Sequence, residues 1–367
     1  MAVYKIFPEK DATLYSQYPA MNAGIDEIIE ATTAEAVDGS PTVSRFLVQF
    51  PQSEILDVIN NKVTSSLAVY FRTSVAKVTG LAEEVTLINY AVSGAWQNGT
   101  GKYLDSPAVQ NGVSWKYRTT SGSNAWALTS FGSTGATASY SVSYEGGGNW
   151  YTSSTYIQSA SLQYRSDFDL SFNVTSTVLA WYSGSIINNG FIIKQGDLSE
   201  FNSSKTVELK YFSVDTNTIY PPQLEFRWVD FTFNTGSSTQ TIINTADLVA
   251  TLPNNAGTFS SESIQRFRVN VRPQFPPRVF TTSSFYTTNY YLPTASYWSI
   301  KDLDTNEVVI DFDSTYTKIS ADSNSSYFNV YMNGLEPERY YQILIQTKVD
   351  GTTKILDDKY YFKVING

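Results

Sequence analysis

Short runs in which apolar and polar residues alternate recur along the whole chain. The run Arg-Phe-Leu-Val-Gln-Phe places Phe46, Val48 and Phe50 on one face of an extended segment, because successive side chains of a strand point to opposite faces. The same reasoning predicts further strands at 66–72, 161–165, 169–174, 190–194, 207–212, 223–228 and 265–272. Residues 53–59 predict either one short helical turn capped by Ser53 or an irregular crossover. The pattern predicts an all-β fold without long helices.

Two turn signals predict hairpins in the last third of the chain. Asp350-Gly351 separates a strand at 340–349 from one at 352–364, and this dipeptide suits the two-residue type I′ turn. A second hairpin is expected over 296–312, with its turn at 304–306.

The chain is longer than one ordinary β-sandwich, so we expect two domains in its 367 residues. Pro221 and Pro222 suit the entry to an edge strand. We therefore place a first domain at 1–230 and a smaller β-sandwich at 231–367. Residues 93–165 scatter Trp among Gly, Ser, Asn and Thr, which indicates an elaborated insertion. It should contain some strands, because loops of that length without any are rare in compact domains.

The composition favours strands and excludes several kinds of binding and catalytic site. The chain has 26 Tyr, 21 Phe and 7 Trp, and aromatic residues favour pleated sheets. Its net charge of -9 argues against binding to nucleic acid or to an anionic membrane. With no Cys and no His, it has no disulfide, thiolate nucleophile, imidazole base or His-based metal site. No apolar signal segment opens the chain, so we expect a product made in the cytoplasm of its host.

Several motifs follow one another in a recurrent order through the first 230 residues. They are Asp11-Ala12-Thr13-Leu14-Tyr15, Asn22-Ala23-Gly24, Ser44-Arg45-Phe46-Leu47-Val48-Gln49-Phe50, Ala95-Trp96-Gln97-Asn98-Gly99-Thr100-Gly101, Val178-Leu179-Ala180-Trp181-Tyr182-Ser183-Gly184 and Asn188-Asn189-Gly190-Phe191. This order resembles the DNRLP-type, carbohydrate-binding-module-like jelly rolls. The resemblance implies a jelly roll for the first domain. The C-terminal domain resembles immunoglobulin-like or fibronectin-type sandwiches in style, as in Gly334-Leu335-Glu336-Pro337 before a strand.

Three further stretches are similar to virion structural proteins of tailed marine and cyanobacterial phages. They are Gly112-Val113-Ser114-Trp115-Lys116-Tyr117-Arg118, Gly146-Gly147-Gly148-Asn149-Trp150-Tyr151-Thr152 and the segment from Tyr211 to Pro222. Asn217 and Gln223 stand where those proteins often carry His and Cys, which argues against metal chemistry in that segment. The resemblance implies a neck, collar, head-decoration or fibre protein located in the virion. Its partners would be copies of itself and other virion proteins.

Paired carboxylates are the catalytic option that the composition leaves open, because glycosidases need two acids and no His. Glu9 with Asp11, and Asp167 with Asp169, are the candidates. Acids two positions apart in a strand share a face. The alternative for both pairs is a solvated strand face.

Asp302, Asp304 and Asn306 imitate the start of a calcium-binding loop, in which oxygen ligands alternate. Glu307 stands where that loop needs Gly, and Asp313 where Glu is preferred. The alternative is a plain hairpin turn. We expect no other cofactor, although the resembled modules often hold structural calcium elsewhere in the jelly roll.

Two surface features could contact partners. Arg266, Arg268 and Arg272 lie on one strand face and could dock an acidic surface, or they could simply be the solvated face of the strand. Aromatic residues could stack on sugar rings or form subunit interfaces, with packing in the core as the alternative. These candidates are Trp96, Trp115, Trp126, Trp150 and Tyr151, with a second cluster of Phe285-Tyr286, Tyr290-Tyr291 and Tyr297-Trp298.

These observations predict a non-enzymatic virion structural protein that works by subunit assembly and surface contact. One alternative is a receptor module that binds a host-surface glycan. Another is a polysaccharide-degrading enzyme that uses the paired carboxylates.

Overall fold

The computed structural model describes residues 2–81, 84–120, 122–126, 146–165, 167–196, 199–202, 206–236, 240–275 and 288–367. The described chain is built mainly from antiparallel strands, which confirms the predicted all-β sandwich class. It divides into two compact units. The N-terminal unit contains Ile6–Lys62 and Ala68–Glu225, and the C-terminal unit contains Met1–Lys5, Val63–Leu67 and Phe226–Gly367. The sequence pattern did not indicate that the two short early segments belong with the C-terminal residues.

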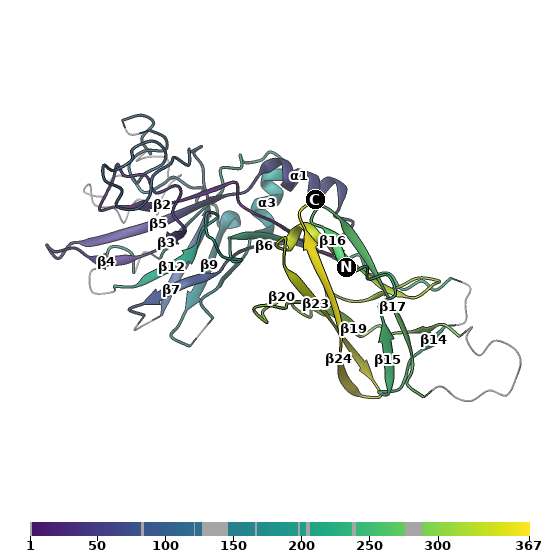
Figure 1. Cartoon of the computed structure of the whole chain (residues 1–367). Coiled ribbons are helices and arrows are strands. Elements are labelled where there is room, and N and C mark those ends of the chain that lie inside the picture. Colours follow the sequence, from purple (N-terminus) through teal and green to yellow (C-terminus); the bar gives the residue numbers. More distant parts are fainter. Residues whose placement is uncertain are drawn as a thin grey trace, which may run out of the picture. The chain divides into compact units, whose positions relative to one another are not determined.

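The N-terminal unit is organised around one sheet in the order β2-β5-β11-β8-β9, with β4 paired to the start of β5. Figure 1 labels β2, β4, β5 and β9 of this sheet. The bounds of these strands are β2 Lys10–Tyr15, β4 Thr33–Glu35, β5 Pro41–Gln49, β8 Val85–Ala91, β9 Ile157–Leu162 and β11 Phe191–Gln195. A second sheet has the order β3-β12-β7, from Ile28–Glu30, Glu208–Phe212 and Val75–Thr79. Strands β6 Leu67–Thr73 and β10 Leu170–Asn173 pair antiparallel.

One face of the large sheet packs on aromatic residues of the other strands. The ring of Phe71 in β6 stacks on Phe191 in β11 at 5.0 Å and meets Phe50 at 5.7 Å. Phe46 contacts Tyr211 of β12 at 5.7 Å. Strand β5 is buried on both faces, not only on the face of Phe46 and Val48. The alternation of apolar and polar residues predicted burial of that face alone.

The opposite face of that sheet is covered by the predicted insertion. Four tryptophans from this region join side chains of the sheet in a buried cluster. The cluster includes Leu14, Leu47, Ile192, Trp96, Trp115, Trp126 and Trp150. Of the described residues in 93–165, only β9 forms a strand and Ser154–Tyr156 a short 3-10 helix, so the cover consists mainly of loops.

Among the described residues, two short helices interrupt the sheets. α1, Gln52–Asn61, buries Ile55 and Val58 on one face. Its N-terminal boundary residue is Pro51, so the predicted cap at Ser53 is wrong: Ser53 lies inside the first turn. α3, Thr175–Tyr182, was not predicted, because its apolar residues lack a clear helical period. Among the described residues, no helix has the length and apolar character needed to cross a membrane.

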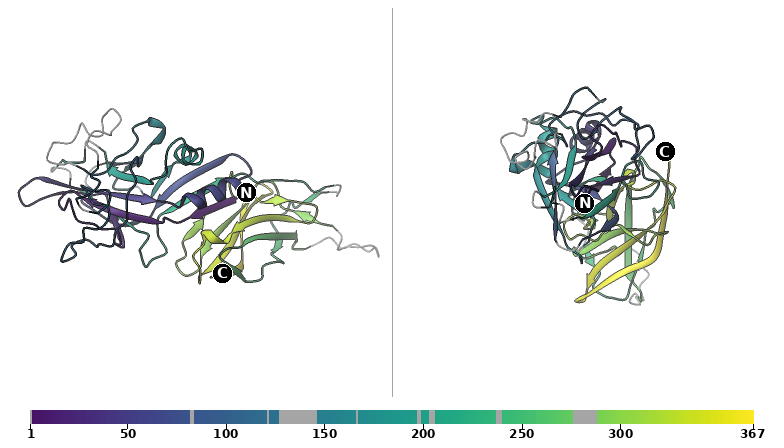
Figure 2. Two further views of the ribbon diagram at one scale, coloured as in Figure 1. Left: turned by 90° about the horizontal axis from the view of Figure 1, so that it is seen from above. Right: turned by 90° about the vertical axis from the view of Figure 1, so that its left-hand side faces the viewer.

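Most of the described strands of the C-terminal unit, coloured green to yellow in Figure 2, belong to two sheets. One has the order β14-β18-β17-β22-β21 with β15 on β17, and the other has the order β16-β24-β23-β19-β20. The bounds are β14 Thr241–Ile242, β15 Leu248–Thr251, β16 Thr258–Ser260, β17 Ile264–Pro273, β18 Tyr290–Tyr291, β19 Ser296–Asp302, β20 Val308–Ile310, β21 Ser320–Ala321, β22 Ser326–Tyr331, β23 Tyr340–Val349 and β24 Thr352–Ile365. Strands β1 Ala2–Ile6 and β13 Gln223–Trp228 each run across a boundary between the units, and Met332–Gly334 form a 3-10 helix.

Stacked rings fill the core of the C-terminal unit. Trp298 stacks on Phe328 at 5.2 Å, and Phe328 stacks on Phe267 at 5.5 Å. The hairpin predicted at Asp350-Gly351 is present between β23 and β24, and both turn residues have the positive φ of a type I′ turn, 48° and 74°.

Candidate binding site

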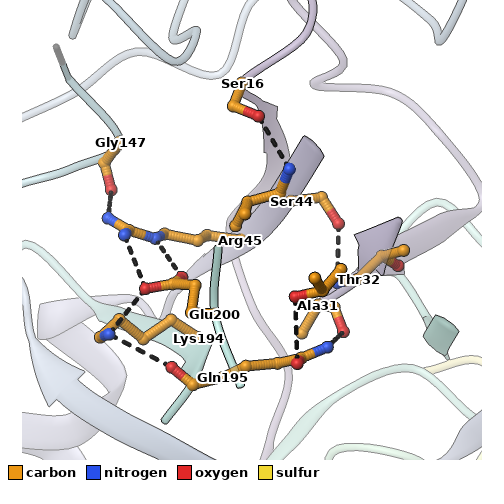
Figure 3. A network of polar contacts seen from close by, with 11 residues as sticks. Ser16, Ala31, Thr32, Ser44, Arg45, Gly147, Lys194, Gln195 and Glu200 are labelled. Atoms are coloured by element: carbon orange, nitrogen blue, oxygen red, sulfur yellow. Dashed lines mark hydrogen bonds and ion pairs between the residues drawn. The ribbon is translucent and has the colours of Figure 1, made fainter. Parts of the chain in front are cut away.

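A network of charged side chains lies in the interior of the N-terminal unit (Figure 3). Arg45 donates from Nε to Oε1 of Glu200 at 2.7 Å and from Nη2 to Oε2 at 2.9 Å. Lys194 donates from Nζ to Oε2 of Glu200 at 2.8 Å. The three side chains are at most 1% exposed.

The sheet register explains why two cations meet here. Ile192 of β11 pairs antiparallel with Leu47 of β5, so Lys194, two residues after Ile192, and Arg45, two residues before Leu47, emerge on that same face. Like charges in this position repel, and the carboxylate of Glu200 between them compensates. Burial would raise the pKa of Glu200, but the positive charges of Arg45 and Lys194 outweigh that effect and hold the pKa below its usual range.

The same network fixes the insertion to the sheet. Nη1 of Arg45 donates to the carbonyl of Gly147 at 2.7 Å, and its guanidinium lies 4.9 Å from the ring of Trp115 and 5.3 Å from Trp150. Guanidinium groups favour aromatic faces when they are removed from water. These contacts hold the loops of the insertion against β5, and we infer that the network stabilises the fold.

Further polar contacts lead from this network to the surface. Nε2 of Gln195, next to Lys194, donates to the carbonyl of Ala31 at 3.1 Å. The following amide, Thr32 N–H, donates to Oγ of Ser44 at 2.9 Å. Thr32 and Ser44 also line a surface pocket, so these contacts connect the network to one wall of it.

That pocket has a volume of about 150 Å³ and lies over β2, β3, β4, β5 and β12. Its lining residues are Tyr15, Gln17, Glu30, Thr32, Ala34, Thr42, Val43, Ser44, Tyr103, Glu208 and Lys210. Aromatic rings and a few convergent polar groups in one concavity are the usual composition of a small-ligand site.

The tryptophans predicted as a glycan platform or interface are buried. Trp96, Trp115, Trp126 and Trp150 are at most 3% exposed, so their ring faces cannot stack on a sugar at the surface. The platform hypothesis is wrong for these four residues because they cover the second face of the large sheet. Tyr151 is half-buried and contacts Tyr156 edge to face.

The second predicted aromatic cluster also contains both buried and half-buried residues. Tyr291 and Trp298 are buried in the C-terminal unit, and the hydroxyl of Tyr291 donates to the carbonyl of Ser323. Tyr290 and Tyr297 are half-buried. The pair Phe285-Tyr286 lies outside the described residues.

At Asp302, Asp304 and Asn306 the structure matches the hairpin turn, the alternative to a calcium loop, because Asp302 serves a turn and an ion pair. Oδ1 of Asp302 accepts from the backbone N–H groups of Asp304 and Thr305 at 2.9 Å each, and Arg339 binds both carboxylate oxygens at 2.6 and 2.8 Å. Asn306 has a φ of 63°, as a turn requires. Among the described residues, no group of three or more acidic side chains is placed to hold a metal ion.

The arginine stripe has internal partners. Arg268 makes a two-pronged ion pair with Asp322 at 2.9 and 3.0 Å. Arg266 donates to Oδ1 of Asn329 at 3.1 Å, and Arg272 donates to the carbonyl of Pro273 at 3.2 Å. Arg266 and Arg272 are exposed, which matches the solvated strand face better than a prepared docking stripe.

The paired carboxylates do not form catalytic pairs. Glu9 is exposed, whereas Asp11 is 1% exposed and accepts from the N–H of Val214 at 2.6 Å. Burial raises the pKa of Asp11 to about 8. Asp167 and Asp169 are both exposed in a turn, where Asp167 accepts from the N–H of Asp169 at 3.1 Å.

Sequence reasoning missed the residues that build the network and the pocket. Arg45 is followed by the apolar run Phe46-Leu47-Val48, and Lys194 directly follows the apolar run Phe191-Ile192-Ile193, which was a usable signal for a buried cation. Glu200 and Tyr103 lie in loops and carried no such signal.

Neither a family model nor a curated protein matches this chain. One solved structure, titled "Crystal structure of HCR/D-Sa-GBL1/C", aligns over 96% of this chain and 68% of its own, at 8% identity and a TM-score of 0.17. A likeness this low carries no argument about fold or function.

Proposed function

We propose that this chain is a non-enzymatic structural subunit of a phage particle, which assembles with copies of itself and with other virion proteins. The motif order in residues 1–230 supports the phage assignment as a resemblance. The charged side chains support a scaffold role, because they bind one another within the chain. Arg45 pairs with Glu200, and Arg339 pairs with Asp302.

The observation that carries the assembly proposal is the edge of β24. This strand has fourteen residues, and β23 pairs along one side of it. On the other side, among the described residues, β16 pairs with Lys363, Val364 and Ile365 alone. In the part of the chain that the structure describes, no strand pairs with the backbone edge over 352–360 on this side, and we infer that a strand of another molecule pairs there, which is a common route to subunit pairing.

Large apolar side chains are exposed on the hairpin of β23 and β24 that contains this edge. Ile355 is 54% exposed, Tyr340 is 49% exposed and Tyr361 is 37% exposed. Ile355 pairs with Gln346, and Tyr361 with Gln342, so the register places them on one face of the hairpin. An edge flanked by apolar side chains gives a partner both backbone hydrogen bonds and buried area.

Charged residues and a bulge in β24 limit which strands can pair with this edge. Asp357, Asp358 and Lys359 lie midway along β24, Lys359 has a φ of 57°, and the register shifts at this point. Charges and bulges on an edge strand suppress unselective pairing. An assembly partner must therefore accommodate the bulge.

Light scattering of the purified chain over a range of concentrations tests this proposal. We expect a defined oligomer whose mass falls toward the monomer in Ile355→Asp. Ile264→Asp is the matched control, because Ile264 is 55% exposed at the start of β17 in the other sheet. A monomeric wild-type chain at every concentration, or equal effects of the two substitutions, contradicts assembly through β24. Mass spectrometry of the purified particle tests the virion assignment, which fails if the chain is absent.

A further inference from the structure

The outer edge of β24 presents its backbone groups at alternate residues. Strands β23 and β24 meet in the two-residue turn Asp350-Gly351, so the residues that flank this turn form the first hydrogen-bonded pair of the hairpin. Successive N–H and C=O groups of a strand point to opposite sides. The backbone groups of Thr353, Ile355 and Asp357 therefore point away from β23, and in the part of the chain that the structure describes no strand pairs with them.

This edge has a defined length. It begins at the turn. At its other end, Nδ2 of Asn255 donates to the carbonyl of Tyr361 at 2.9 Å, and the N–H of Lys363 donates to the carbonyl of Gly257 at 2.8 Å. The segment around Asn255 thus covers β24 from Tyr361 onward. A strand that pairs with the edge must end before that point.

The middle of the edge carries an exposed apolar side chain. Ile355 is 54% exposed, whereas the next residue, Leu356, is 4% exposed and belongs to the core. Thr353 and Asp357 are exposed on the same face as Ile355, because side chains of a strand alternate between its faces. An apolar residue directly opposite Ile355 on a partner strand would remove both side chains from water.

The charges along the edge favour an antiparallel copy of the same strand. Lys354 lies toward the turn, and Asp357 and Asp358 lie toward the other end. A parallel copy in register would set each acid opposite itself, and like charges in that position repel. An antiparallel copy brings the acidic end of each strand to the end that carries Lys354. Nζ of Lys354 donates to the carbonyl of Ala246 at 2.6 Å, and an ammonium group has further N–H donors for a partner.

The length of the edge restricts the register of such a copy. Antiparallel registers that oppose the outward backbone groups near the middle of the edge are centred on Lys354, Ile355 or Leu356. Centring on Lys354 sets two lysines opposite each other. Centring on Leu356 brings the partner's turn to residues 361–362, where the segment around Asn255 covers the edge.

The register centred on Ile355 avoids both conflicts. It sets the two isoleucines opposite each other on the exposed face, and it sets Thr353 of each copy opposite Asp357 of the other. The partner's turn then falls near residues 359–360, so the paired strand ends just before the covered part of the edge.

We propose that the strand that pairs with the edge of β24 is β24 of a second copy of this chain, antiparallel about a two-fold axis at Ile355. This rests on the assembly through β24 proposed above and specifies its partner and register. The pairing joins two five-stranded sheets into one continuous sheet. Both copies use the same surface, so the interface closes at a dimer.

Single cysteines test this register, because the wild-type chain has no Cys and any disulfide in a single-cysteine variant joins two copies. In Ile355→Cys the substituted residues lie opposite each other with Cα atoms about 5.5 Å apart, a separation that a disulfide spans. After air oxidation of the full chain, we expect a band at twice the chain mass in a non-reducing gel, which dithiothreitol removes. Ile264→Cys is the matched control, because Ile264 is 55% exposed in the other sheet of the same unit. It should stay at the chain mass.

Thr353→Cys and Asp357→Cys test the direction of the partner strand. Each variant alone should stay at the chain mass, because its two cysteines are offset by about 13 Å along the paired strands. That separation exceeds the reach of a disulfide. An equal mixture of the two variants, combined before oxidation, should cross-link, because position 353 of one copy lies opposite 357 of the other. These two variants keep Ile355, so they remain informative if Ile355→Cys weakens the pairing.

Light scattering of the wild-type chain under the same conditions distinguishes failure of the self-pairing from failure of the assembly. An oligomeric wild type whose Ile355→Cys variant cross-links no more than Ile264→Cys overturns the pairing of β24 with itself and leaves the assembly standing. Cross-linking of Thr353→Cys or Asp357→Cys alone overturns the antiparallel register. A monomeric wild type at every concentration overturns both proposals.

Discussion

Arg45 and Glu200 form a two-pronged ion pair in the interior of the N-terminal unit, at 2.7 and 2.9 Å, although they are 155 residues apart in the sequence. Lys194 binds the same carboxylate at 2.8 Å. Removing one partner of a buried ion pair costs far more than the pair contributes in net terms, because the remaining charge stays away from water.

Glu200→Gln should therefore lower the free energy of unfolding by about 3–5 kcal/mol. Glutamine keeps the size of the side chain but withdraws the negative charge from Arg45 and Lys194. Urea denaturation followed by tryptophan fluorescence measures the change. Glu208→Gln is the control, since the Glu208 side chain is 42% exposed and its loss should cost less than about 1 kcal/mol. Equal effects would mean that the buried network is not a principal source of stability.

The buried carboxyl of Asp11 should make stability depend on pH between about 4 and 8. Burial raises the pKa of Asp11 to about 8, and the negative charges of Asp215 and Asp26 act in the same direction. The hydrogen bond from the N–H of Val214 lowers the pKa, but by less than burial raises it. In this range the folded chain keeps a proton that the unfolded chain releases. Stability contributed by Asp11 is therefore complete below about pH 4 and is lost as pH rises toward 8, by at most about 1.4 kcal/mol per unit.

Asp11→Asn should flatten this dependence, because its amide carbonyl can still accept from Val214 while nothing titrates. The comparison is the difference in unfolding free energy between pH 5 and pH 8 for each protein. The wild type should lose more than the variant. Parallel pH profiles would show that Asp11 titrates normally.

Asp302 should give the opposite pH dependence in the C-terminal unit. Burial alone would raise its pKa, but the hydrogen bonds from Arg339 and Thr305 prevail and hold it at about 2. Its contribution is present above about pH 4 and is lost as pH falls toward 2, for a total of about 2 kcal/mol.

Asp302→Asn tests this contribution while keeping an oxygen that can cap the turn. The variant should be less stable than the wild type at pH 6, and the difference should shrink toward pH 2 in urea denaturation. Asp304→Asn is the control, because the side chain of Asp304 is 63% exposed and lies 3.8 Å from Arg339. It should change stability by no more than about 0.5 kcal/mol. A constant deficit of Asp302→Asn at all pH values would assign its effect to the turn.

The sequence allowed prediction of the elements whose causes are local. Alternation located β17, and the Asp350-Gly351 turn located the β23–β24 hairpin, because both depend on neighbouring residues. Burial of the tryptophans could not be decided, because it depends on which sheet face the insertion covers. The candidate site was not predictable for the same reason: Tyr103 reaches Tyr15 only through the folded loop.

Two glycines should differ in their tolerance of alanine although both have positive φ. Gly351, at 74°, has open space around the position of a Cβ atom, so Gly351→Ala should cost only the conformational term of about 1–2 kcal/mol. Gly190, at 83°, lies against the β5 backbone, where a Cβ would be 2.8 Å from Cα of Gln49 and closer still to the carbonyl of Val48. Gly190→Ala should add the cost of displacing that strand, for about 2–5 kcal/mol in total. Thermal unfolding of the two variants measures the contrast, and equal losses would show that the approach of Gly190 to β5 does not limit packing there.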